Sequence, residues 1–291
     1  MSQYVIKSQV FTAPAVPPAL YLAATPIGNL GDITLRVLEH LAGSDLIACE
    51  DTRVTGKLLR HYGIKRKLLA YHEHNADTAG PMLLEEVRSG RSVVLVSDAG
   101  TPIVSDPGFR LVVQAREMDI PIIPLPGASA PLAALVASGL SAETWLFAGF
   151  LPAKKGARLT RLSELATVNA TLIVFESPKR VHQTLDEMRD AFGPKRRVCL
   201  ARELTKLHEE IKTAPLEALI AEFNAREVRG EVVLVVAPPA QKSPGDTDTL
   251  LKELLQTMPL SQAAAEAAAL TGVSKRDLYQ RALALKESAN E

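Results

Sequence analysis

The stretch VLVSDAGTPIVSDPG, residues 94–108, decides the fold class of this chain. Its apolar, β-branched run ends at Val96, and the loop that follows packs two Asp, two Pro, two Gly, two Ser and one Thr into twelve residues. Open α/β sheets bind ligands at loops of this kind, which follow the carboxyl ends of buried strands. The loop has no Lys, no Arg and no G-x-G-x-x-G pattern. It is therefore poorly suited to hold a phosphate, and it suits a ligand with amino, hydroxyl or cationic groups.

Short apolar runs alternate with helical patterns on both sides of this loop. Strands are expected near residues 19–24, 46–49, 68–71, 93–97 and 120–125, and helices near 33–41, 54–61, 82–88 and 109–118. This alternation indicates βαβ units and a mostly parallel sheet. Asp32 is expected to cap the first helix, and Gly63 and Gly90 fit the carboxyl ends of two later helices.

The second half of the chain has a related pattern. Helices are expected near 158–165, 180–191 and 216–223, and strands near 171–176, 197–203, 210–213 and 231–237. The chain is therefore predicted to be an α/β protein with a small C-terminal helical domain. Four parts are expected: a flexible arm (1–17), an N-terminal α/β domain (18–150), a second α/β domain (151–240), and a linker with a helical, HTH-like tail (241–291).

Composition excludes several classes of protein. The 291 residues carry 33 Lys+Arg and 33 Asp+Glu, so the chain is no polycation, and a net charge of zero is compatible with a local basic patch. The two cysteines, Cys49 and Cys199, form no C-x-x-C pair, which argues against structural zinc and favours a reduced, cytoplasmic setting. Prolines interrupt the long uncharged stretches 8–31 and 120–142, so we expect no membrane anchor.

Two further loops fit the ligand-binding interpretation. Residues 21–32 (YLAATPIGNLGD) give a strand, a Gly-rich turn and a helix start, and residues 126–130 (PGASA) follow another predicted strand. Each pattern alone is equally typical of an ordinary tight turn. Because parallel strands end at one edge of a sheet, we expect both loops to meet the loop 97–108 there.

An ordered set of segments resembles the tetrapyrrole methylase superfamily. The segments are TPIGNLGD (25–32), CEDTR (49–53), SDAGTPIVSDPG (97–108), PGAS (126–129), FESPKR (175–180), ARELTK (201–206) and GE (230–231), so the resemblance runs over about residues 19–237. It implies two α/β domains of tetrapyrrole-methylase type, with S-adenosylmethionine in the cleft between them, usually in a homodimer. The family's Gly-Asp-Pro loop is Ser97-Asp98-Ala99 here, and this departure argues against a tetrapyrrole substrate.

The resemblance also implies particular roles. The most similar branch methylates the ribose 2′-hydroxyl of a decoding-site cytidine in the 16S rRNA of the small ribosomal subunit. By resemblance, the cofactor contacts in the first half are Pro26, Ser97, Asp98, Ala99, Ile103, Ser105, Ala128 and Ser129. Those that close the adenine side are Phe175, Leu204 and Pro238.

The chemistry of methyl transfer points to further candidates. The sulfonium already carries an activated methyl group, so no metal is expected. A ribose hydroxyl is a poor nucleophile and needs a base or a stabilising cation. We expect Glu50 or Asp51 as the base and Arg53 near an RNA phosphate, although a helix cap with an ion pair explains the same residues. His72-x-His74 lacks a third metal ligand. Asp98 and Asp106 are expected to hold the methyl donor rather than to catalyse.

Basic residues suggest an RNA-binding surface. Phosphate contacts are expected from Lys154, Lys155, Arg158, Lys179 and Arg180 and, in the tail, from Lys275 and Arg276. Further basic clusters lie at 65–67 and 195–197, and any such cluster is equally explained as a solvated face. With only 4% aromatic residues, an extended base-stacking platform is not expected.

The tail pattern places Ala268, Gly272 and Leu278 at helix-turn-helix positions. An αα-hairpin packed on the body or on a second subunit is the alternative. Two other functions stay open: methylation of a small tetrapyrrole, and RNA binding without catalysis.

Overall fold

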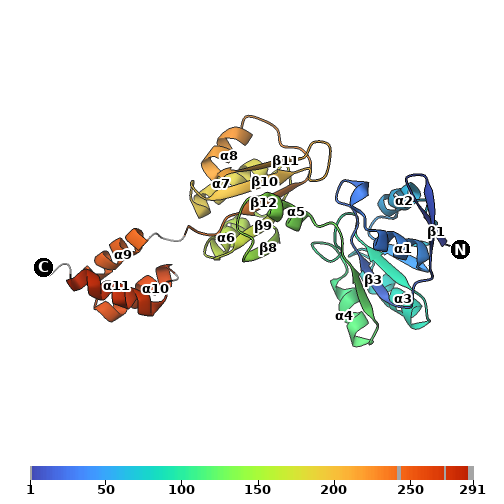
Figure 1. Ribbon diagram of the computed structural model, residues 1–291, viewed down its shortest axis with the longest axis horizontal. Coiled ribbons are helices and arrows are strands. Elements are labelled where there is room, and N and C mark those ends of the chain that lie inside the picture. The colour runs from blue at the N-terminus through green and yellow to red at the C-terminus, as the bar shows by residue number, and fades with distance from the viewer. Residues whose placement is uncertain (1, 241–243, 272, 288–291) are drawn as a thin grey trace. The chain divides into compact units, whose positions relative to one another are not determined.

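Five short apolar strands form the first sheet, which is entirely parallel. In the computed structural model, which describes residues 2–240, 244–271 and 273–287, the strand order is β5-β4-β6-β3-β7. The strands are β3 (Leu20–Ala23), β4 (Leu46–Cys49), β5 (Leu68–Ala70), β6 (Val93–Val96) and β7 (Ile122–Leu125). Every residue of β4 and β6 is buried because helices cover both faces of the sheet (Figure 1).

Alternate residues of each strand point to opposite faces of this sheet. Val94 and Val96 pack in a core with α1 (Leu35–Gly43) and α2 (Thr52–His61). Val93 and Leu95 pack with α3 (Ala76–Arg88) and α4 (Phe109–Glu117) on the other side. The predicted parallel α/β arrangement is confirmed, and all the strand carboxyl ends lie along one edge.

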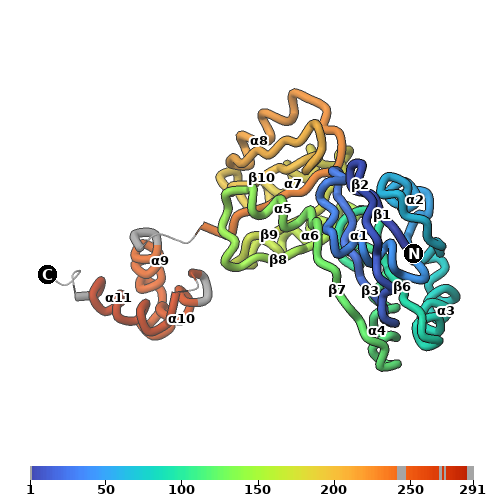
Figure 2. The backbone as a smooth tube through the Cα atoms, turned by 45° about the vertical axis from the view of Figure 1, so that its right-hand side comes forward, coloured from blue at the N-terminus to red at the C-terminus, as the bar shows by residue number. Residues whose placement is uncertain are grey.

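The N-terminal residues form a hairpin, so the predicted flexible arm is wrong over residues 2–13. Strands β1 (Ser2–Ile6) and β2 (Gln9–Ala13) pair antiparallel, and Tyr4 stacks on Phe11 with ring centroids 5.4 Å apart. Tyr4 and Ala13 are buried in the same core as α1, and the hairpin lies beside that helix (Figure 2). Each strand buries too few side chains to show a periodic pattern in the sequence.

The residues at the helix ends are only partly those predicted from the sequence. Thr34 caps α1 by accepting a hydrogen bond from the Val37 amide at 3.2 Å. Asp32 instead belongs to the short 3-10 helix η1 (Leu30–Asp32), so its predicted capping role is wrong. Gly63 and Gly90 follow α2 and α3 with φ of 66° and 89°, which confirms their predicted places at helix ends.

The second sheet is mostly antiparallel, with the order β11-β10-β12-β9-β8. Its strands are β8 (Trp145–Phe150), β9 (Thr171–Glu176), β10 (Arg197–Arg202), β11 (Glu210–Pro215) and β12 (Val232–Val236). One face packs against α6 (Lys155–Ala166), α7 (Val181–Phe192) and α8 (Leu216–Phe223). The other face packs against α5 (Ala130–Ala137). The last strand in the sequence, β12, thus lies in the middle of its sheet.

The predicted domain boundary at residue 150 is wrong. Both α5 and β8 belong to the second half, so the chain crosses between the sheets after β7 ends at Leu125 and before α5 begins at Ala130. Strand β8 was not predicted from the sequence because it is a partly exposed edge strand. A register shift between Phe147 and Gly149 also interrupts the alternation of its side chains between the two faces of the sheet.

The chain divides into two compact units, Met1–Pro238 and Pro239–Glu291. The second contains α9 (Pro244–Thr257), α10 (Leu260–Thr271) and α11 (Lys275–Glu287), so the predicted helical tail is confirmed and begins inside the expected linker. Leu278 is fully buried and Ala268 packs against the same core. Gly272, the predicted turn residue, lies outside the described residues. Among the described residues, no helix is long and apolar enough to cross a membrane.

Candidate functional site

The loops that follow β3, β6 and β7 meet at one edge of the first sheet. The Thr25 amide donates to the Gly100 carbonyl at 2.8 Å, and the Gly100 amide donates back at 3.0 Å. The Thr101 hydroxyl donates to the Ala128 carbonyl at 3.3 Å, which ties in the third loop. The juxtaposition predicted from the three sequence patterns is therefore present.

A cavity of about 350 Å³ lies between these loops and the second sheet. Its walls come from residues 99–106, the start of α5, the ends of β8 and β9, and the start of β12. Phe175 and Phe150 both line it with ring centroids 5.3 Å apart, and Phe147 packs against Phe175 from the core at 5.1 Å. Four of the predicted cofactor residues line this cavity: Ala99, Ser105, Ser129 and Phe175.

A second cavity, of about 220 Å³, lies beside the start of α2. Three predicted cofactor residues line it: Pro26, Ser97 and Asp98. The loop after β6 thus contributes its first two residues to this cavity and its later residues to the larger one.

The four remaining predicted cofactor residues line neither cavity. Ala128 and Leu204 pack in the core that joins α5 to the second sheet, together with Ile27 and Phe175. Ile103 packs against Gly108, and Pro238 is half-buried just after β12. Ala128 and Leu204 thus belong to the same core as two residues that line the larger cavity, Ile27 and Phe175.

Asp51 serves as a helix cap and ion-pair partner. Its carboxylate accepts from the Arg53 amide at 2.8 Å and pairs with the Arg53 guanidinium at 2.6 Å. These hydrogen bonds lower the pKa of Asp51 to about 2. A carboxylate with that pKa is a weak base, so the geometry favours the cap interpretation for Asp51.

Two other carboxyl groups in the first half, those of Glu50 and Asp106, have raised pKa values instead. Burial raises the pKa of Glu50, and the nearby charge of Asp98 adds to the effect while His72 opposes it. Burial, followed by the charge of Glu50, raises the pKa of Asp106 to about 6. Asp106 also lines the larger cavity. Nothing in the sequence singled it out as a base, because its burial depends on tertiary packing.

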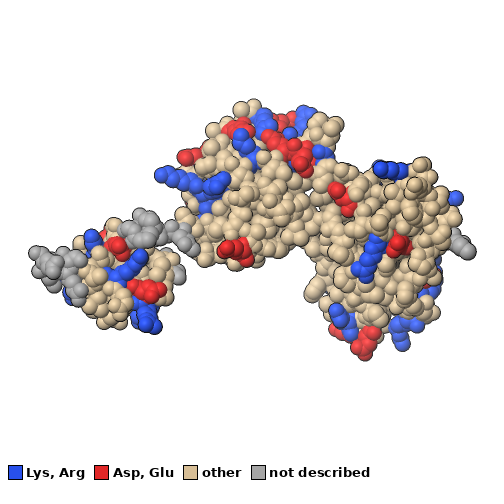
Figure 3. All heavy atoms as spheres, viewed as in Figure 1, with Lys and Arg blue, Asp and Glu red and all other residues tan. Residues whose placement is uncertain are grey.

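The predicted RNA-binding residues fall into two groups. Lys154, Lys155 and Lys179 are exposed, as are Lys275 and Arg276 at the start of α11. On the face drawn in Figure 3, basic and acidic side chains are interspersed over both α/β halves.

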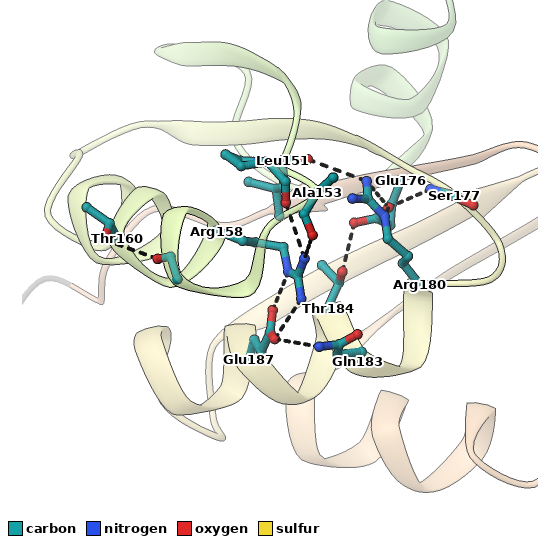
Figure 4. A network of polar contacts seen from close by, with 12 residues as sticks. Leu151, Ala153, Arg158, Thr160, Glu176, Ser177, Arg180, Gln183, Thr184 and Glu187 are labelled. Atoms are coloured by element: carbon teal, nitrogen blue, oxygen red, sulfur yellow. Dashed lines mark hydrogen bonds and ion pairs between the residues drawn. The ribbon is translucent and has the colours of Figure 1, made fainter.

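Arg158 is 2% exposed and forms a bidentate pair with Glu187 at 2.6 and 2.9 Å (Figure 4). The prediction that Arg158 contacts RNA is therefore wrong, because its donors are already occupied inside the protein. Arg180 is partly exposed but donates to Glu176 at 2.8 Å and to the Leu151 carbonyl at 3.4 Å.

Two family models match this chain. Tetrapyrrole (Corrin/Porphyrin) Methylases match residues 19–220, and the RsmI C-terminal HTH domain matches residues 241–286. Ribosomal RNA small subunit methyltransferase I of Mesorhizobium japonicum is 55% identical over 283 residues, which cover 96% of each chain. The Vibrio cholerae protein of the same name is 46% identical over 276 residues, covering 92% of this chain and 96% of its own.

Solved structures share the fold at lower identity. A cobalamin biosynthetic enzyme, cobalt precorrin-4 methyltransferase, matches with a TM-score of 0.58 at 18% identity, covering 75% of this chain and 94% of its own. Uroporphyrin-III C-methyl transferase from Thermus thermophilus complexed with S-adenyl homocysteine matches with a TM-score of 0.54 at 21% identity, covering 75% and 97%.

Proposed function

We propose that this chain, which belongs to the tetrapyrrole methylase family and is closely related to the ribosomal RNA small subunit methyltransferase I proteins, methylates the ribose 2′-hydroxyl of a decoding-site cytidine in 16S rRNA. The chain is an S-adenosylmethionine-dependent rRNA methyltransferase. The ribose oxygen and the particular cytidine are the proposed refinement. One observation carries the choice of RNA over a tetrapyrrole: the relatedness to rRNA methyltransferases extends over 96% of the chain.

The larger cavity fits the cofactor by size and by charge. Its volume of about 350 Å³ lies in the range of small-molecule sites. Its lining contains three carboxylates, Asp106, Glu176 and Glu231, and neither Lys nor Arg among the described residues. Such a lining suits a sulfonium cation. When bound there, S-adenosylmethionine supplies an activated methyl group; Phe150 and Phe175 offer apolar surface for its adenine, and Ala99, Ser105 and Ser129 would contact the rest.

The RNA would be held through its backbone. The exposed Lys154, Lys155 and Lys179 of the second α/β half and the exposed Lys275 and Arg276 of the tail supply the cations for phosphate contacts. Because these contacts depend on counterion release, affinity should fall steeply as salt rises.

The enzyme is proposed to work as a homodimer in the cytoplasm, where ribosomal subunits are assembled. Several large apolar side chains are exposed on α5 and on the edge strand β8: Leu132, Val136, Trp145 and Leu146. Val136 is 79% exposed. An apolar surface of this kind suits a second copy of the chain. Analytical ultracentrifugation of the wild type should show a dimer, and Val136→Lys should raise the dissociation constant of that dimer. A monomeric wild type would contradict this proposal.

One experiment tests the function. The protein is incubated with methyl-labelled S-adenosylmethionine and, separately, with 30S subunits, free 16S rRNA and uroporphyrinogen. The RNA is then digested and the labelled nucleoside identified by mass spectrometry. We expect label on a cytidine ribose. Label on a base would reject the ribose assignment, and label on uroporphyrinogen alone would favour the tetrapyrrole alternative. Cofactor binding without label in any acceptor would favour a non-catalytic RNA-binding protein.

A further inference from the structure

Asp106 is held in a tightly folded part of the loop after β6. Ile103 and Ser105, just before it, have φ of 77° and 69°, a region that residues other than Gly seldom occupy. Gly108, just after it, has φ of 137°, and a Cβ there would lie 2.9 Å from Ile103 Cγ1 and 3.1 Å from Leu95 Cδ2. The loop is therefore packed against itself and against β6, which fixes the position of Asp106 on the cavity wall.

The three carboxylates of this cavity differ in their partners. Glu176 accepts hydrogen bonds from the Ser177 amide, the Arg180 guanidinium and the Thr184 hydroxyl, at 2.6, 2.8 and 2.7 Å. Glu231 pairs with Lys206 at 3.1 Å. Asp106 has no cationic partner within 4.0 Å among the described residues. It is thus the cavity carboxylate whose charge is not neutralised by an ion pair.

We propose that Asp106 is the general base that takes the proton from the substrate ribose hydroxyl, an inference that rests on the proposed function. The oxygen lone pair forms the new bond to the methyl carbon as the sulfur–methyl bond breaks, and its electron pair stays on sulfur. The cofactor leaves as neutral S-adenosylhomocysteine. The hydroxyl proton passes to the Asp106 carboxylate, which later releases it to water. Atoms and charge balance without a metal or a further reactant.

The electrostatic surroundings support this role. Glu50 follows β4 and Asp98 follows β6, and both place negative charge near Asp106. Glu176 and Glu231 line the same cavity from the second sheet, and their cations, Arg180 and Lys206, are already paired with them. With a pKa of about 6, Asp106 is mostly ionised at neutral pH and is a stronger base than an ordinary carboxylate. Asp51 is also ionised at neutral pH, but its hydrogen bonds with Arg53 lower its pKa and make it a weaker base than Asp106.

The test compares Asp106→Asn, Asp106→Glu and wild type in single-turnover methyl transfer to 30S subunits at saturating S-adenosylmethionine. Glu117→Gln, on the exposed end of α4, is the matched control. We expect Asp106→Asn to lower the rate by about 10²–10⁴-fold, and Asp106→Glu to retain part of it. S-adenosylmethionine affinity, measured by calorimetry, should fall far less than the rate, because Glu176 and Glu231 still line the cavity. Thermal unfolding verifies that each variant is folded.

A pH profile separates catalysis from a structural role. The wild-type rate should rise about tenfold per pH unit up to about pH 6 and then level off, whereas the residual rate of Asp106→Asn should lack this step. An Asp106→Asn rate above a tenth of wild type overturns the inference. Loss of cofactor affinity in proportion to the rate also overturns it, because Asp106 would then bind the donor. A wild type that labels no ribose overturns the proposed function itself, and the inference with it.

Discussion

Two carboxylates from each α/β half, all at least partly buried, differ in whether a cation accompanies them. In the second half, Glu187 is buried against Arg158, and Glu176 is buried against Arg180 (Figure 4). In the first half, burial raises the pKa values of Glu50 and Asp106, and neither forms an ion pair within the described residues. A buried carboxylate with a cation fixes packing, whereas one without a cation keeps a high proton affinity that chemistry can use.

The difference follows from sheet topology. The parallel strands of the first sheet all end at one edge, so the loops after β4 and β6 bring Glu50, Asp98 and Asp106 close together. In the second half, Glu187 on α7 lies opposite Arg158 on α6, across two helices that pack side by side. Topology thus gathers like charges at the edge of the first sheet and opposite charges between α6 and α7.

The largest effect is expected when the buried Arg158–Glu187 pair of the second half is broken. Arg158→Ala leaves Glu187 buried without its cation, and we expect it to lower the free energy of unfolding by about 3–5 kcal/mol. Urea denaturation measures this loss. The double variant Arg158→Met/Glu187→Leu should recover most of it, because no charge is then left buried. A loss below about 1 kcal/mol for Arg158→Ala would contradict the structural role given to this pair.

A second prediction contrasts the pH dependence of stability in the two halves. Asp106 has a pKa raised from 3.8 to about 6, so the folded state binds more protons between these values and stability falls as pH rises through them. Asp106→Asn removes this cost. After discounting for partial exposure, we expect a gain of about 1–2 kcal/mol at pH 7 that vanishes below about pH 4.

Glu187 should show the opposite sign. Hydrogen bonds from Arg158 lower the pKa of Glu187, so its stabilisation is present above its unfolded pKa of 4.5 and is lost as pH falls through the folded value. Glu187→Gln should therefore lower the unfolding temperature at pH 7 and have less effect in acid. Thermal scans of both variants from pH 3 to 8 measure the contrast, and changes of equal sign at pH 7 would refute it.

The sequence patterns predicted most helices and strands and the meeting of the three loops. They did not predict which residues pair with the buried charges. The strand Leu46–Cys49 and the helix Leu216–Phe223 were predicted with the observed bounds, because a short apolar run and an amphipathic stretch are local signals. Arg158 was predicted to contact RNA because nothing local links it to Glu187, 29 residues later on another helix. Asp106 gains its burial and its charged neighbours from distant segments, which no local pattern encodes.

The smallest expected effect concerns Asp51, an exposed first-half carboxylate that is paired with a cation. Asp51→Ala removes the cap of α2, and we expect a smaller loss in the free energy of unfolding than for the buried Arg158–Glu187 pair. Asp51→Asn should keep most of the stability, because Asn caps helices about as well as Asp. Equal losses in the two variants, measured by urea denaturation, would show that the ion pair with Arg53 matters more than the cap.

The central position of β12 in its sheet sets the order in which the enzyme can be completed during synthesis. β9 and β10 precede it in the chain, yet each must wait for β12 to cover one edge. Those unpaired edges are the part of the nascent protein most prone to pair with another chain. Val232 and Val233 also line the larger cavity, so the cavity closes only when this last strand is inserted. A ribosome must therefore make nearly the whole first unit before it has made a working methyltransferase.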